Sequence, residues 1–135
     1  MTKPHEVAEH KKRRGYSFPH EKLAAWRKAK DFTIFIYRIT KSLPHSEKYG
    51  LISQLRRAAI SVASNLAEGS ARTSPRDQAH FTQIAYSSLM ETVCQLQIAH
   101  ELNLLDEHSY AEAREKAGEL AAMLNSLYAS QQRKA

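Results

Sequence analysis

Charged side chains within two helical stretches of the sequence offer its clearest chemistry. Arg56 and Arg57 are adjacent in the first stretch, and Asn65 and Glu68 lie beside its apolar line; Glu91 lies among apolar residues of the second. A carboxylate left unpaired in a protein core costs several kcal/mol. We therefore expect Glu91 to be largely buried and paired with one of the two arginines, in a structural polar network with Asn65 and Glu68. A ligand-binding groove and plain surface exposure of Glu91 are the alternatives.

The sequence lacks the common catalytic and metal-binding motifs. Its four glycines are scattered, so they form no glycine-rich phosphate loop. No histidine follows a glutamate by three residues, the spacing of di-metal four-helix bundles, and the nearest match is Asp77 with His80. The single cysteine, Cys94, lies in mid-helix with nothing basic one turn away and is expected to be a buried small apolar residue. We expect no catalytic residues, metal or cofactor, and an enzyme ranks third among the possible functions.

Basic residues are concentrated in the first part of the chain. Residues 1–75 hold fifteen basic and six acidic residues, whereas residues 76–135 hold five and eight. Such an imbalance is typical of proteins that bind nucleic acid through phosphate contacts, which carry no sequence information. No helix-turn-helix, zinc finger or aromatic RNA-binding motif accompanies it. The candidate phosphate-binding residues are Lys11, Lys12, Arg13, Arg14, Arg56, Arg57, Arg72 and Arg76.

Four helices are predicted to position these residues. Apolar residues recur at helical spacing in the ranges 19–43, 46–68, 75–102 and 109–130. Pro44 is expected to end the first helix and Gly69 to provide a left-handed residue after the second. Ser74 is the expected N-cap of the third helix, and Ser109 begins a capping box for the fourth.

The predicted fold is an all-α, antiparallel up-down four-helix bundle over residues 17–130. A basic leader precedes it at 1–16, and a polar tail follows at 131–135. The third helix is apolar on more than one side, which indicates a central helix or an oligomer contact. No run approaches the roughly 18 apolar residues of a membrane span. With a polar N-terminus and one cysteine, these features favour a cytoplasmic protein.

The second predicted helix carries a recognisable signature. The strings YGL (49–51), QLRRAAISV (54–62) and NLAEG (65–69), followed by Arg72, resemble the four-helix bundle family of rRNA intervening-sequence proteins. The resemblance implies a closed antiparallel bundle that assembles as a homopentameric ring. Accessory proteins of diversity-generating retroelements are similar in fold, assemble in fives and bind nucleic acid through a basic surface. No enzymatic activity is attached to the family.

These observations together predict a non-enzymatic, cytoplasmic homo-oligomer that binds RNA or another nucleic acid through a basic face. Five subunits are favoured only by the resemblance. The alternative is a protein-interaction or scaffold module whose charge serves solubility alone. The two are separated by whether Arg56, Arg57 and the other arginines are exposed together or used in internal pairs.

Overall fold

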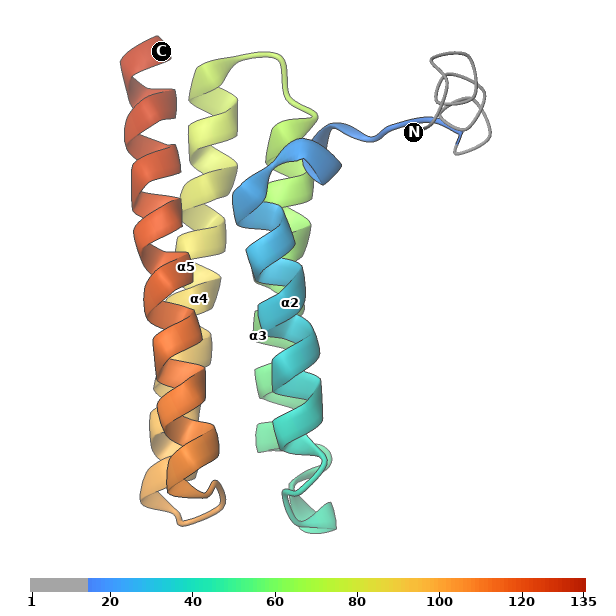
Figure 1. Ribbon diagram of the computed structural model, residues 1–135, viewed down its shortest axis with the longest axis vertical. Coiled ribbons are helices and arrows are strands. Elements are labelled where there is room, and N and C mark those ends of the chain that lie inside the picture. Colours follow the sequence, from blue (N-terminus) through green and yellow to red (C-terminus); the bar gives the residue numbers. More distant parts are fainter. Residues whose placement is uncertain (1–14) are drawn as a thin grey trace, which may run out of the picture.

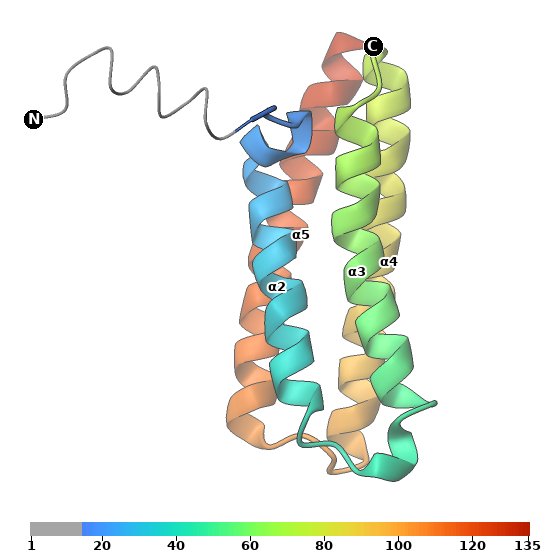
Figure 2. The same ribbon diagram turned by 90° about the vertical axis from the view of Figure 1, so that its right-hand side faces the viewer.

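The computed structural model describes residues 15–135, which form four long helices and no strand (Figure 1). The helices are α2 (Ala24–Thr40), α3 (Leu51–Ser70), α4 (Pro75–Glu101) and α5 (Glu107–Lys134), with short 3-10 helices η1 (Pro19–Lys22) and η2 (His45–Glu47). Consecutive long helices run in opposite directions, and α2 and α5 close the arrangement (Figure 2). The prediction of an all-helical fold with four helices is confirmed for these residues.

The core lies where the apolar spacing places it. In α2, Ala25, Ala29, Phe32, Ile36 and Ile39 are all buried, at steps of three and four residues. The same spacing buries one line in each of the other helices. Those residues include Leu55, Val62 and Leu66 in α3, Ala85, Leu89 and Leu96 in α4, and Ala113, Leu120 and Leu124 in α5.

The first two predicted helices are shorter than expected. The range 19–43 is interrupted at Leu23, whose extended backbone separates η1 from α2. At the other end, the Thr40 hydroxyl donates to the Ile36 carbonyl at 2.7 Å in the last turn of α2. Leu43 is buried beyond the helix end. Likewise α3 begins only at Leu51, after η2, so the predicted start near Ser46 was wrong.

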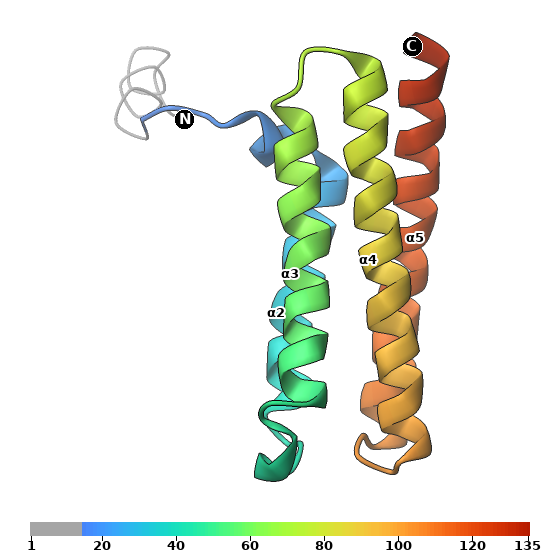
Figure 3. The same ribbon diagram turned by 180° about the vertical axis from the view of Figure 1, so that it is seen from behind.

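Gly69 is a residue of α3 and not its left-handed terminator. The helix continues through it to Ser70, and Gly69 is buried against α4. A Cβ at this position would lie 2.8 Å from the Cβ of Phe81. The missing side chain therefore allows α3 and α4 to approach closely at this point. Figure 3 shows the two helices side by side, joined by the turn that follows Gly69.

The caps of the last two helices differ in how well they were predicted. Ser74 caps α4 as expected, because its hydroxyl accepts from the Asp77 amide at 3.1 Å. For α5 the cap is Asp106, whose carboxylate accepts from the Ser109 amide at 2.8 Å and the Ser109 hydroxyl at 2.9 Å. The helix also continues to Lys134, so residues expected to form a polar tail are helical.

Candidate nucleic-acid interface

One end of the bundle brings together segments that are far apart in sequence. The start of the described chain, the α3–α4 turn and the end of α5 all lie at this end (Figures 1 and 2). We call it the leader end and define it as residues 15–27, 66–80 and 128–135. It holds six lysines and arginines against three carboxylates. The cations are Lys22, Arg27, Arg72, Arg76, Arg133 and Lys134.

Arg72 and Arg76 are exposed together at the α3–α4 turn. The guanidinium of Arg72 lies 4.9 Å from the centre of the Phe81 ring. The Gln78 side chain holds the turn by donating to the Arg72 carbonyl at 2.8 Å. Within residues 15–135 neither arginine makes an ion pair with a carboxylate. Both cations are therefore available to an anion that approaches the leader end.

Arg56 and Arg57 lie elsewhere, so the eight candidate residues do not form one face. At 1.5 Å per residue, they are about 20 Å from Arg72 along α3. Arg56 is half-buried: its Nε donates to Thr40 Oγ1 at 3.0 Å, and its guanidinium lies 4.5 Å from the Tyr37 ring centre. Arg56 thus joins α2 to α3, whereas Arg57 is exposed. The predicted residues Lys11, Lys12, Arg13 and Arg14 lie outside the described residues.

The expected ion pair between Glu91 and an arginine does not form. Glu91 is exposed, and its carboxylate accepts from Gln95 Nε2 at 3.3 Å. The reason is helical rotation: Ser88 faces α3, and Glu91, three residues later, is turned about 60° further toward solvent. Glu68 is exposed as well.

A smaller polar cluster joins α3 to α4 instead. The hydroxyls of Ser61 and Ser88 are 2.8 Å apart across the helix interface. Asn65 Nδ2 donates to the Ser61 carbonyl at 2.8 Å and to its hydroxyl at 3.1 Å. Asn65 therefore bonds to Ser61, and neither Glu68 nor Glu91, the partners predicted for it, is among its hydrogen-bond partners.

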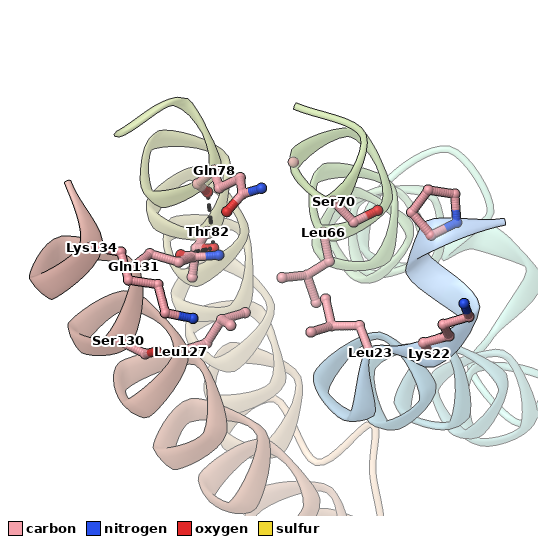
Figure 4. A pocket seen from close by; sticks show the side chains of 12 residues that line it. Lys22, Leu23, Leu66, Ser70, Gln78, Thr82, Leu127, Ser130, Gln131 and Lys134 are labelled. Carbon is pink, nitrogen blue, oxygen red and sulfur yellow. Dashed lines mark hydrogen bonds between the residues drawn. The ribbon is translucent and has the colours of Figure 1, made fainter. Parts of the chain in front are cut away.

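A pocket of about 290 Å³ opens at the leader end between η1, α3, α4 and α5 (Figure 4). Leu23, Leu66 and Leu127 form its apolar part. On one wall, Thr82 Oγ1 donates to Gln131 Oε1 at 2.7 Å. Lys22 and Lys134 also line the pocket, but no histidine, cysteine, aspartate or glutamate does. The lining thus lacks a carboxylate or imidazole for acid-base chemistry and adds positive charge to the leader end.

Residues 15–135 offer little support for other kinds of site. No group of three histidine, cysteine, aspartate or glutamate side chains is arranged to hold a metal ion there. Cys94 is exposed and not buried as expected, because it lies on the outer side of α4. In the same part of the chain, no helix combines the length and apolar character needed to cross a membrane.

Sequence reasoning missed an aromatic cluster at the leader end. Tyr16, Phe18, His20 and Trp26 follow one another with ring centres 5.3, 6.1 and 4.5 Å apart. The available signal was the spacing of Tyr16 and Phe18, two residues apart, which places both side chains on one side of an extended segment. His20 follows them in η1. No family motif marks this spacing, so composition and charge alone did not indicate it.

Comparison with known proteins agrees with the fold and with the signature in α3. The model of the 23S rRNA-intervening sequence protein family matches residues 21–126. The chain belongs to this family. A similar solved structure is that of a protein of unknown function from the S23 ribosomal protein family of Bacteroides thetaiotaomicron. It matches with a TM-score of 0.70 and 18% identity, over 78% of this chain and 98% of that one, which supports the same fold. No curated protein matches the chain.

Proposed function

We propose that this chain is a non-enzymatic, homo-oligomeric four-helix protein that binds RNA or another nucleic acid through its leader end. The observation that carries the proposal is the excess positive charge of that end, which contains six lysines and arginines but only three aspartates and glutamates. In the sequence, the basic run from Lys11 to Arg14 directly precedes residue 15, where the leader end begins. Clustered cations attract the phosphate backbone and release its counterions.

Arg72 and Arg76 are the proposed phosphate ligands of the described bundle. Both are exposed, and neither is neutralised by a carboxylate within residues 15–135. A guanidinium can bind phosphate through two parallel hydrogen bonds, which makes arginine well suited to this contact. Because such contacts reach only the backbone, we expect little discrimination among sequences.

Assembly is supported by apolar side chains that the bundle leaves exposed. Met90 and Ile98 on α4 are 39% and 47% exposed, Leu102 at its C-cap is 58% exposed, and Ile60 on α3 is 42% exposed. An exposed apolar face of this kind favours contact with another protein surface. We propose a ring-like homo-oligomer, with five subunits favoured by the family resemblance alone. Repeating the leader end in each subunit would strengthen binding through multivalency.

We propose a cytoplasmic location because the cysteine is a free thiol. Cys94 is free and exposed on α4. Exposed thiols persist most readily in reducing compartments, where disulfides are rare.

The test is a gel mobility shift with structured RNA, single-stranded DNA and duplex DNA. The double variant Arg72→Ala, Arg76→Ala should bind more weakly and lower the salt slope by roughly two units, because each arginine that binds a phosphate adds about one unit. Deleting residues 1–14 should lower the slope further. The matched control is Arg38→Ala, Arg57→Ala, which removes two exposed arginines outside the leader end and should change the slope little.

The alternative function is a protein-interaction or scaffold module, and the exposed apolar residues of α4 favour it. Under this alternative, the full-length protein shows no shift even at about 50 mM salt, where electrostatic binding is strong. That result would replace the nucleic-acid proposal with the scaffold one.

A further inference from the structure

The leader end exposes aromatic rings that the bundle does not need for its core. Tyr16 is 77% exposed and Phe18 is 53% exposed, although large aromatic side chains usually bury most of their surface. Phe18 and His20 lie nearly parallel, at an interplanar angle of 19°. The His20 and Trp26 rings pack edge to face, with their centres 4.5 Å apart. The rings therefore form a continuous row, which ends on the half-buried Trp26 of α2.

Hydrogen bonds hold the backbone beneath this row. The Phe18 amide donates to Glu21 Oε1 at 2.7 Å. The guanidinium of Arg27 in turn donates to the Glu21 carbonyl at 2.9 Å. These bonds tie the extended segment to η1 and α2, so the rings are presented in a set arrangement. A surface arranged before binding loses less conformational entropy when a ligand arrives.

Cations border the aromatic row. The Lys30 ammonium lies 5.3 Å from the Trp26 ring centre, and Lys22 and Arg27 are exposed nearby. The one carboxylate in the range 15–30, Glu21, already accepts the Phe18 amide. Flat aromatic faces beside positive charge match a single-stranded nucleic acid, whose bases can stack while its phosphates meet cations. A duplex is a poorer match because its base faces are already stacked on one another.

We propose that Tyr16, Phe18, His20 and Trp26 form a platform on which unpaired bases of a single-stranded nucleic acid stack. Lys22, Arg27 and Lys30 contact the phosphates beside it. This inference rests on the proposed function and narrows its ligand to single strands or single-stranded regions. It also gives the leader end a preference for bases, which phosphate contacts alone would not provide.

Four probes of about 20 nucleotides, longer than a typical single-strand site, separate base stacking from phosphate contacts. They are oligouridine RNA, oligothymidine DNA, an abasic DNA strand with the same number of phosphates, and a duplex. Trp26 is the only tryptophan, so its fluorescence reports directly on stacking at the platform. We expect oligouridine and oligothymidine to bind more tightly than the abasic strand and to quench the fluorescence of Trp26.

The double variant Tyr16→Ala, Phe18→Ala should lose at least about tenfold in affinity for both oligouridine and oligothymidine, since each stacked base contributes at least about fivefold and two rings are removed. Its binding to the abasic strand should be unchanged. The matched control is Tyr49→Ala, which removes a tyrosine 88% exposed in the turn before α3 and should bind like the wild type. A second variant, Tyr16→Leu with Phe18→Leu, keeps apolar surface without aromatic faces and should also lose affinity.

Each contrary outcome has a distinct meaning. If all four probes bind equally and the platform variants match the wild type, the platform is overturned while the proposed function stands. Binding of the leucine variant at wild-type affinity would overturn it too, because apolar surface would then suffice. If light scattering shows a smaller assembly for the alanine variant while its nucleic-acid binding is unchanged, the platform is overturned and the rings belong to a contact between subunits. If no probe binds at about 50 mM salt, the proposed function fails as well.

Discussion

Gly69 is the residue at which the packing of α3 on α4 is most restrictive. A Cβ there would lie 2.8 Å from the Phe81 Cβ, an atom fixed to the α4 backbone. Gly69→Ala should therefore separate the helices and destabilise the protein by about 1–2 kcal/mol, even after the gain in helix propensity. Urea unfolding measures this difference.

Gly118 in α5 provides the matched control. No atom lies within 4 Å of a Cβ added at Gly118, and the residue is exposed. Gly118→Ala should stabilise the helix by about 0.5–1 kcal/mol. Equal unfolding midpoints for the two variants would contradict the account of Gly69.

Arg56 and Arg57 are neighbours in sequence with different roles. Arg56→Ala removes the bond to Thr40 and the contact with the Tyr37 ring, and should lower the free energy of unfolding by about 1–2 kcal/mol. Arg57→Ala removes an exposed side chain and should stay within about 0.5 kcal/mol of the wild type. Thermal melts of both variants decide between this assignment and one in which both arginines serve only a ligand.

At the scale of the element, Asp106 controls the start of α5. Its hydrogen bonds from the Ser109 amide and hydroxyl hold its pKa below the ordinary value of 3.8. A carboxyl with a lowered folded pKa stabilises the fold above its unfolded pKa, and this contribution is lost as the pH falls through the folded value. The difference in melting temperature between the wild type and Asp106→Ala should thus be largest near neutral pH and narrow below about pH 4.

An uncharged cap separates this charge effect from capping in general. Asparagine is also a good N-cap, and it does not titrate. The difference between Asp106→Asn and Asp106→Ala should therefore stay nearly constant with pH. If the difference in melting temperature between the wild type and Asp106→Ala is also constant from neutral to acid pH, the ionisation of Asp106 does not stabilise the helix.

The helices were predictable because apolar spacing is a local property of the sequence. The residues that pack in α2, from Ala25 to Ile39, follow one face and are buried as expected. Helix ends were less predictable, since they depend on bonds that compete. Asp106 and Ser109 are both good capping residues, and only the structure shows that the first caps the helix and the second donates to it.

The candidate site was less predictable than the helices because it depends on which ends meet. Arg57 and Arg72 are close in sequence, yet α3 separates them by about 20 Å. Gly69 needed its partner Phe81 on another helix before its role could be assigned. The prediction that Glu91 is buried was wrong because a polar residue among apolar ones in the sequence can still face solvent when the helix rotates it away from the interface.

At the scale of the whole molecule, the proposed assembly makes a direct prediction. Light scattering should give a mass that is a multiple of 15.3 kDa, with five subunits favoured by the resemblance. Charging the exposed face of α4 with Ile98→Glu and Leu102→Glu should reduce the assembly to the monomer, because a buried carboxylate is costly.

The matched control for assembly is Ile34→Glu on α2, a helix that packs on α3 and α5 and is not a neighbour of α4 in the bundle. Ile34 is 45% exposed, close to the 47% of Ile98, so the two positions differ mainly in the face they occupy. This variant should keep the wild-type mass. A wild-type protein that is monomeric at micromolar concentration would rule out the ring.

The most direct test of the central claim is the salt dependence of nucleic-acid binding by the full-length protein. Affinity for a single strand should fall linearly on logarithmic axes, with a slope near −4 if about six cations contact phosphates, at roughly 0.7 per contact. Six such cations are Lys11, Lys12, Arg13, Arg14, Arg72 and Arg76. If the platform cations Lys22, Arg27 and Lys30 also contact phosphates, the slope steepens toward about −6. Tight binding at low salt that weakens along such a slope is the predicted result. A flat slope, or no binding at about 50 mM salt, would contradict it.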